Sequence, residues 1–210
     1  MDACRGYILT GGQSSRMGRD KALLPFGGRP LAVWMAELLR QVCAAVTLVG
    51  SREMHSGLGV SVTEDVFPGR GPLAGIHAAL SDSSAPFSLV LGCDMPYVTP
   101  EFLRELVEIA RSSGADAVVP ESEAFGYEPL CAVYGRNSLL PIEQSLRAEE
   151  KSIRTVLGRL RLRPVTTAEW KPFDPCGRLF LNLNTPEDYE EARKELLAGS
   201  SLSRPSARER

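Results

Sequence analysis

The chain has 210 residues, of which 43% are hydrophobic and 24% are charged, and its formal net charge is −2 at pH 7. This length suits a single α/β domain with a sizeable core, and the nearly neutral charge excludes a broad electrostatic attraction to nucleic acid or anionic lipid. Five cysteines without a C-x-x-C pair argue against a disulfide framework or a zinc site, and the lack of a signal-peptide pattern or a membrane-length apolar run predicts a cytoplasmic protein.

The first predicted element is a short apolar strand over residues 7–9, which leads into a segment rich in glycine and basic residues. Glycine lets the backbone pass close to a ligand and adopt positive φ, so that consecutive N–H groups converge on anionic oxygens. Arg16 and Lys21 would add full positive charges to that cradle. We therefore predict a phosphate-binding loop over residues 9–21, with an ordinary surface loop rich in glycine and serine as the alternative. The glycine spacing matches neither a Walker A motif nor a dinucleotide-binding fingerprint.

The next segments predict the opening of a parallel sheet. Apolar residues recur at helical spacing over residues 31–42, and a β-branched run over 44–49 is typical of a buried strand. A strand, a helix and a strand in succession favour a right-handed crossover between parallel neighbours. Residues 60–63 alternate as a further short strand, which ends just before Asp65.

A helix is predicted over residues 72–80, and it contains His77. A lone histidine on a helix is more often packed or solvated than catalytic, so we give His77 no role. His55 lies in a stretch that is predicted to be a polar loop, and it is given no role either.

The clearest central strand is predicted over residues 87–92, and Asp94 follows shortly after its end. In a doubly wound sheet, ligands gather beyond the carboxyl ends of the strands, so we expect the glycine-rich loop, Asp65 and Asp94 to share one crevice. A carboxylate beside a phosphate loop is a natural Mg²⁺ ligand. The alternative for Asp94 is a helix cap, but Thr99 suits that position better and leaves Asp94 available for the metal.

The second half of the chain predicts helices over residues 102–110, 137–147, 152–157 and 187–197, a strand over 116–119, an extended segment over 127–134, and an edge strand with a wet basic face over 160–165. Together the elements predict one domain with a three-layer α/β/α fold and a mostly parallel Rossmann-like sheet that has a mixed C-terminal part. This domain is expected to span residues 1–198. Residues 199–210 have too little apolar content to pack, so we expect a disordered, solvated tail there.

Asn182 and Asn184 precede the last predicted helix. If residues 181–184 are extended, the two amides share one face, because side chains alternate along a strand. On spacing alone, the pair suits equally well a cap for that helix or a site that holds a substrate phosphate or a water near the metal.

Four motifs together resemble the nucleotidyltransferases that activate sugars and cofactors, a superfamily with a Rossmann-like, GT-A-type fold, and most closely the molybdenum cofactor guanylyltransferase family. The resemblance covers residues 7–197, nearly the whole chain. The first motif is highly specific for the superfamily, whereas Gly-Gly after the strand and the Asn-x-Asn-Thr-Pro ending favour the guanylyl branch. The motifs are Leu9-Thr10-Gly11-Gly12 with Arg16-Met17-Gly18 and Asp20-Lys21-Ala22-Leu23-Leu24, then Gly71-Pro72-Leu73-Ala74-Gly75, Cys93-Asp94-Met95-Pro96 and Asn182-Leu183-Asn184-Thr185-Pro186.

The resemblance implies transfer of GMP from GTP to the terminal phosphate of molybdopterin, with or without molybdenum, with release of pyrophosphate and a requirement for Mg²⁺. The implied partners are GTP and molybdopterin as substrates, with transient contacts to proteins that deliver molybdopterin and to apo-molybdoenzymes, and neither nucleic acid nor a membrane. The roles that it implies are nucleotide contacts from Leu9, Thr10, Gly11, Gly12 and Asp65, phosphate binding and catalysis by Arg16 and Lys21, binding of Mg²⁺ and nucleotide and catalysis by Asp94, and the pterin side for Asn182 and Asn184.

One position departs from the family pattern. The family often has an asparagine just after the second strand that helps to read the base, and here Gly50 and Ser51 follow Val49. Two alternatives therefore stay open. One is a cytidylyl- or sugar-nucleotidyltransferase with another acceptor. The other is a catalytically silent nucleotide-binding protein, against which the joint presence of Arg16, Lys21 and Asp94 counts.

Overall fold

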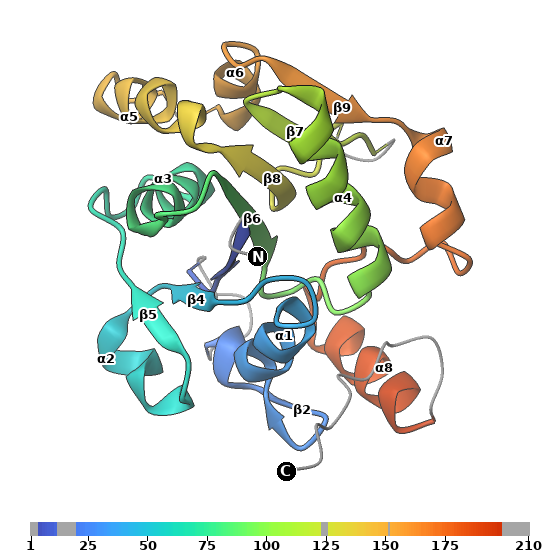
Figure 1. The fold of residues 1–210 in the computed structure, drawn as a ribbon. Coiled ribbons are helices and arrows are strands. Elements are labelled where there is room, and N and C mark those ends of the chain that lie inside the picture. Colours follow the sequence, from blue (N-terminus) through green and yellow to red (C-terminus); the bar gives the residue numbers. More distant parts are fainter. Residues whose placement is uncertain (1–3, 12–19, 123–125, 151, 199–210) are drawn as a thin grey trace.

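The central sheet has seven strands: β1 (Cys4–Leu9), β4 (Val46–Val49), β5 (Ser61–Thr63), β6 (Phe87–Gly92), β7 (Ala117–Pro120), β8 (Cys131–Gly135) and β9 (Leu162–Val165). They come from a computed structural model that describes residues 4–11, 20–122, 126–150 and 152–198, so the predicted tail lies outside the described part. The strand order is β5-β4-β1-β6-β8-β7-β9 (Figure 1). Neighbouring strands are parallel except at β8, which runs antiparallel to β6 and β7. The predicted mostly parallel sheet with a mixed C-terminal part is therefore confirmed.

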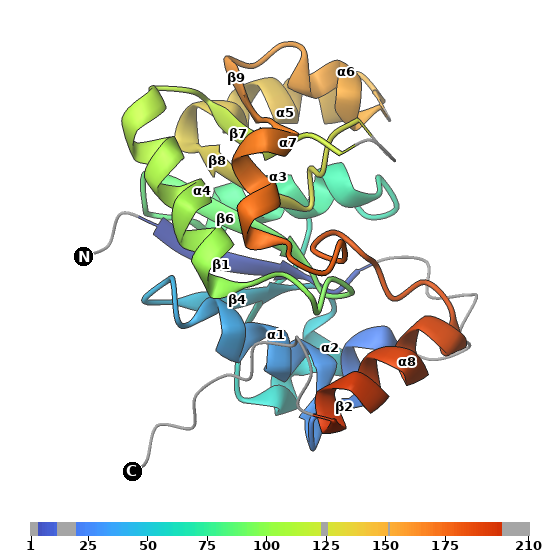
Figure 2. The same ribbon diagram turned by 90° about the vertical axis from the view of Figure 1, so that its right-hand side faces the viewer.

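Helices pack on both faces of this sheet and complete the three predicted layers (Figures 1 and 2). On one side lie α1 (Leu31–Leu39), α4 (Pro100–Ser113) and α8 (Pro186–Leu197), and on the other lie α3 (Pro72–Asp82), α5 (Leu139–Arg147) and α6 (Ile153–Leu157). Shorter elements join them: the helices α2 (Arg52–His55) and α7 (Thr167–Trp170), the 3-10 turn η2 (Lys21–Leu23), and a two-stranded hairpin of β2 (Pro25–Phe26) and β3 (Arg29–Pro30).

The two faces of the sheet are buried in separate apolar clusters, because side chains alternate along each strand. On β1, Ile8 belongs to the cluster with α1, α4 and α8, whereas Tyr7 and Leu9 belong to the cluster with α3 and α5. The central strands are thus buried on both faces, which explains why their sequences are nearly continuous apolar runs. This packing fixes the strand ends at which the candidate site is found.

Most element types agree with the sequence expectations, while several ends differ. The helix predicted over residues 31–42 ends at Leu39, and its last three residues form turns. Thr99 caps α4 as expected, since its hydroxyl accepts a hydrogen bond from the Phe102 N–H at 3.3 Å. Residues 160–165 do contribute an edge strand, β9. Residues 181–184 form no strand.

Two expectations from composition can also be compared with the structure. The cysteines are free thiols, four of them buried, namely Cys4, Cys43, Cys93 and Cys131, and one exposed, Cys176. Among the residues described, no helix has both the length and the apolar content needed to cross a membrane.

The edge strand β9 is tied to α7 by an ion pair whose effect on stability should depend on pH. Arg163 contacts Glu169, which also accepts hydrogen bonds from the Thr166 N–H and hydroxyl, both at 2.8 Å. The hydrogen bond from Arg163 is the largest cause that lowers the pKa of Glu169 to about 2. A lowered folded-state pKa gives stability that is present above the unfolded-chain value and is lost as the pH falls towards 2.

We therefore expect Glu169→Gln to lower the free energy of unfolding near pH 7 by about 0.2–1 kcal/mol, a small value because the side chain is 36% exposed. This deficit should shrink steadily between pH 5 and pH 3. Urea unfolding of the wild type and of Glu169→Gln across that range measures this deficit. A deficit that does not change with pH would contradict the assigned ion pair.

Candidate active site

Hydrogen bonds between loop and strand backbones bring the predicted site residues to one edge of the sheet. The Cys93 N–H donates to the Leu9 carbonyl at 3.1 Å, and the Thr10 N–H donates to the Val49 carbonyl at 3.0 Å. The ends of β1, β4 and β6 are thereby tied to one another. Asp94, which follows Cys93, and the start of the glycine-rich segment consequently lie side by side, as the parallel topology predicts.

Lys21 and Asp94 meet at this edge. The Lys21 Nζ lies 3.5 Å from Asp94 Oδ2, and the two side chains are 19% and 31% exposed. Lys21 is placed by η2, the turn that it opens, because Asp20 Oδ1 accepts a hydrogen bond from the Ala22 N–H at 2.9 Å. The ammonium and the carboxylate therefore lie together beyond the carboxyl ends of the strands, and both side chains are exposed enough to contact a ligand.

The predicted nucleotide contacts lie on the β1, β4 and β5 side of this pair. Leu9 is buried and packs against α3, where a Cβ added at Gly75 would come within 2.7 Å of Leu9 Cδ2, so a glycine is needed for this close approach. Gly11 is exposed, and a Cβ there would meet no atom of the described residues within 4 Å. Gly11 does not have the positive φ that a glycine there would allow.

Other predicted nucleotide contacts are less closely joined to that pair. Asp65 is exposed after β5, and in the described part of the chain no hydrogen bond or ion pair joins it to Lys21 or Asp94. Gly12 and Arg16 lie outside the described residues.

The segment with the two asparagines is attached to Asp94 through its backbone. The Leu183 N–H donates to the Asp94 carbonyl at 2.8 Å, and the half-buried Asn182 lines the same cavity as Asp94. The cap of α8 is made by Thr185 and Asp188, each of which accepts a hydrogen bond from the backbone N–H of the other. The side chains of Asn182 and Asn184 are therefore not needed as caps, and the alternative of a ligand contact remains for them.

A cavity of about 400 Å³ opens on the β8 side of Asp94. Because β8 is antiparallel to β6, the residues that precede β8 meet the carboxyl end of β6, where the Gly92 N–H donates to the Leu130 carbonyl at 2.7 Å. The lining combines apolar and polar groups, including Leu73, Asp94, Tyr127, Glu128, Ile153 and Asn182.

Glu128 in this lining was not singled out from the sequence. Its side chain is 6% exposed, and its Oε1 has no hydrogen-bond partner among the described residues. Burial raises the pKa of this carboxyl, while a hydrogen bond with Ser122 opposes that shift. A charged residue just before a buried strand was the signal in the sequence, but only the antiparallel pairing of β8 shows that this residue reaches the site.

The predicted place of His55 was wrong, whereas His77 is packed, one of the two states that were expected for it. His55 belongs to α2, not to a polar loop, and is only 2% exposed. Its ring nitrogens contact Thr10 and Asp20, the residues on either side of the glycine-rich segment. His77 is a packed histidine: it is buried on α3 with its ring edge-on to Phe67 at 5.0 Å, and burial lowers its pKa.

The donor groups at this edge fit a Mg²⁺ ion that arrives with a nucleotide. Within residues 4–11, 20–122, 126–150 and 152–198, no cluster of three or more His, Cys, Asp or Glu side chains could hold a metal by itself. Mg²⁺ is commonly bound through one or two carboxylates together with substrate phosphates and waters. Asp94, a partly exposed carboxylate at a strand end, meets that requirement.

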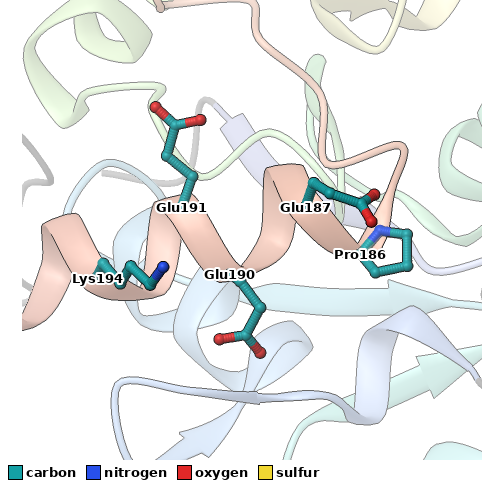
Figure 3. A pocket seen from close by; sticks show the side chains of 5 residues that line it. All are labelled: Pro186, Glu187, Glu190, Glu191 and Lys194. Carbon is teal, nitrogen blue, oxygen red and sulfur yellow. The ribbon is translucent and has the colours of Figure 1, made fainter.

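A second hollow, of about 480 Å³, runs along α8 (Figure 3). Its labelled lining residues all come from that one helix, and two of its carboxylates already pair with arginines, Glu190 with Arg193 and Glu191 with Arg178. It brings together no residues from strand ends, so it is not a candidate active site.

Comparisons with known proteins agree with this geometry. A family model described as the MobA-like NTP transferase domain matches residues 6–165. A protein of Pelotomaculum thermopropionicum named as a probable molybdenum cofactor guanylyltransferase is 38% identical over 189 residues, which are 90% of this chain and 91% of that protein. The molybdenum cofactor guanylyltransferase of Desulfosudis oleivorans is 33% identical over 95% of this chain and 98% of its own length. The crystal structure of molybdopterin-guanine dinucleotide biosynthesis protein A from Archaeoglobus fulgidus is 27% identical, with a TM-score of 0.80 over 92% of this chain and 99% of that one.

Proposed function

This chain belongs to the family of MobA-like NTP transferase domains, and we propose that it transfers GMP from GTP to the terminal phosphate of molybdopterin, with or without molybdenum. The products are pyrophosphate and the guanine dinucleotide form of the molybdenum cofactor. The names of the relatives support this choice of substrates. The observation that carries the proposal is the Lys21–Asp94 pair at 3.5 Å, which stands between the glycine-rich segment and the cavity beside β8.

In the proposed reaction, an oxygen of the acceptor phosphate attacks the α-phosphorus of GTP, and the bond from that phosphorus to the pyrophosphate oxygen breaks. The acceptor is already an anion, so no strong general base is needed, and positioning and charge stabilisation provide the catalysis. Lys21, together with Arg16, holds the phosphates and stabilises the negative charge that develops on them. Mg²⁺ bound at Asp94 would neutralise charge on the phosphate oxygens.

The two substrates approach this pair from opposite sides. The nucleotide is proposed to bind over the ends of β1, β4 and β5, with Leu9, Thr10, Gly11, Gly12 and Asp65 as its contacts. The acceptor is proposed to occupy the cavity beside β8, where Asn182 and Asp94 both lie in the lining and Asn184 follows close by in the chain. Asp94 is then shared by the two halves of the site, so the attacking oxygen and the α-phosphorus would be held close together beside it.

Tracing the label from GTP tests the transfer itself. We expect the acceptor to gain label from GTP labelled at the α-phosphorus and none from GTP labelled at the γ-phosphorus. Label from the γ-position in the acceptor would show a kinase reaction and would contradict the proposal. Mass spectrometry of the product then identifies the dinucleotide.

Gly50 favours one second candidate, a transferase that uses another nucleotide such as CTP. The family often has an asparagine at this place, yet a Cβ at Gly50 would lie 2.1 Å from Thr10 Oγ1. No side chain fits there without displacing Thr10, so the base must be recognised by other groups. Comparison of GTP with CTP as the substrate separates the two candidates.

The buried carboxyl of Glu128 provides a test of the acceptor side. A buried oxygen without a partner is destabilising by roughly 1–3 kcal/mol, and we propose that an N–H group of the acceptor supplies that partner. Glu128→Met, which removes both carboxyl oxygens at similar length, should raise the KM for the acceptor about tenfold and leave the KM for GTP unchanged. Initial rates with each substrate varied in turn measure the two constants, with Glu187→Met on α8 as the control. An equal rise in both constants would instead indicate a general disturbance of the fold.

A further inference from the structure

One imidazole holds both ends of the glycine-rich segment. His55 Nδ1 lies 3.3 Å from Thr10 Oγ1, and His55 Nε2 lies 2.8 Å from Asp20 Oδ2. Thr10 comes directly after β1, and Asp20 comes directly before Lys21 and η2. Groups that are ten residues apart in the chain are therefore joined through a third element, α2, which follows β4.

The hydrogen bonds around this imidazole restrict the orientation of its ring. A carboxylate only accepts, so the Nε2–H of His55 donates to Asp20, whose other oxygen accepts from the Ala22 N–H at 2.9 Å. The Thr10 hydroxyl donates its proton to the Val49 carbonyl at 2.9 Å, and its oxygen lies beside His55 Nδ1. The side chains of His55 and Asp20 are only 3% and 13% exposed, so water competes little for these bonds.

Gly50 provides a second, independent sign that this arrangement is tightly packed. A Cβ added there would lie 2.1 Å from Thr10 Oγ1 and 3.1 Å from both Nδ1 and Cε1 of His55. A side chain at the residue after β4 would therefore have to displace Thr10, one of the two side chains that fix the start of the segment. The ends of β1 and β4 and the start of η2 therefore meet at His55.

We propose that His55 is a positioning residue for the phosphates of the nucleoside triphosphate. It does not touch the substrate. It fixes the backbone at Thr10 and Gly11 and, through Asp20 and η2, the direction in which Lys21 extends towards Asp94. This inference rests on the proposed function, because it concerns the same nucleotide site.

Loss of the imidazole should weaken nucleotide binding and slow the transfer without unfolding the protein. We expect His55→Ala to lower kcat/KM for GTP roughly 10–100-fold, since a displacement of about 1 Å in a positioning group can cost about 100-fold. The effect should appear in kcat as well as in KM, because Lys21 acts on the group being transferred. His77→Gln, a change at the chain's other histidine, is the matched control and should leave both constants as in the wild type.

Variants of Thr10 separate positioning from a general loss of stability and replace His55→Ala if that variant does not fold. Thr10→Ser keeps the hydroxyl and should therefore lose less activity than Thr10→Val, which is nearly isosteric with threonine but lacks the hydroxyl. If the two groups act as one unit, the double variant His55→Ala/Thr10→Val should be little worse than the more impaired single variant. Fully additive losses would contradict a shared role.

The histidine itself gives a spectroscopic readout. The chain has two histidines, so in His77→Gln the remaining imidazole ¹⁵N signals belong to His55. We expect these signals to shift on addition of Mg²⁺–GTP and to be perturbed in Asp20→Asn, as a connection between the ring and the loop requires. Signals that change neither on addition of Mg²⁺–GTP nor in Asp20→Asn would overturn the inference.

Calorimetry of GTP binding distinguishes a failure of the positioning role from a failure of the proposed function. If the wild type binds GTP and His55→Ala binds it equally well with unchanged kcat, the positioning role is wrong while the proposed function stands. If the wild type binds none of GTP, CTP, ATP and UTP, the proposed function fails and the positioning role fails with it.

Discussion

Asp94→Ala should lower kcat by about 10²–10³-fold, the usual loss when one preorganised charge-stabilising group is removed from an active site. Asp94 follows the end of β6, its Oδ2 lies 3.5 Å from Lys21 Nζ, and it lines the cavity beside β8. Its removal takes away the proposed anchor of Mg²⁺ and leaves Lys21 without its partner. Steady-state release of pyrophosphate at saturating GTP measures the change.

The reason for that loss can be tested with a second substitution. Asp94→Asn keeps the size and the hydrogen-bonding oxygen but removes the charge, so it should be nearly as inactive as Asp94→Ala and should need more Mg²⁺ for half of its maximal rate. Asp82→Asn is the matched control, because Asp82 ends α3 and pairs with Arg5 and Tyr7 at the opposite end of β1. Turnover near that of the wild type in Asp94→Ala would remove Asp94 from the mechanism.

Lys21→Ala should also lower kcat by about 10²–10³-fold. The Lys21 side chain is only 19% exposed, so its charge acts in a site from which much water is excluded. We expect the Kd for GTP to rise in addition, because the same ammonium would bind the phosphates before the transfer. Single-turnover rates and calorimetric titration separate the two effects.

Lys21→Arg tests how strictly the site depends on the shape of the cation. Arginine keeps the charge but presents a planar fork in place of a compact point charge, so it should recover the affinity for GTP more fully than the rate. Lys171→Ala is the matched control, since Lys171 begins a 3-10 turn beside Trp170 and is not among the described residues that line the cavity beside Asp94. Equal activity in Lys21→Ala and the wild type would remove Lys21 from the mechanism.

Local signals in the sequence were enough to predict most of the fold. The apolar runs at residues 7–9 and 87–92 became adjacent parallel strands in the centre of the sheet, and Thr99 with Pro100 marked the start of α4. These predictions succeeded because strand burial and helix capping depend mainly on neighbouring residues. The ends of helices were predicted less well, as at residues 40–42, where apolar spacing continues after the helix has ended.

The parts of the site that could not be predicted depend on contacts between distant segments. His55 looked like a loop residue because α2 has only four residues, and its contact with Asp20 spans 35 positions of the chain. The place of Glu128 in the cavity beside β8 depends on the antiparallel pairing of β8 with β6, which no local pattern indicates. Periodicity predicts which residues are buried, but not which buried polar groups meet.

The choice of substrates is tested most directly by measuring pyrophosphate release with Mg²⁺ and each of GTP, CTP, ATP and UTP, with and without molybdopterin. We expect release with GTP alone, and only when molybdopterin is present. Release with CTP in place of GTP would keep nucleotidyl transfer at Lys21 and Asp94 but overturn the assignment of the base. No release with any nucleotide, although GTP still binds, would contradict guanylyl transfer to molybdopterin.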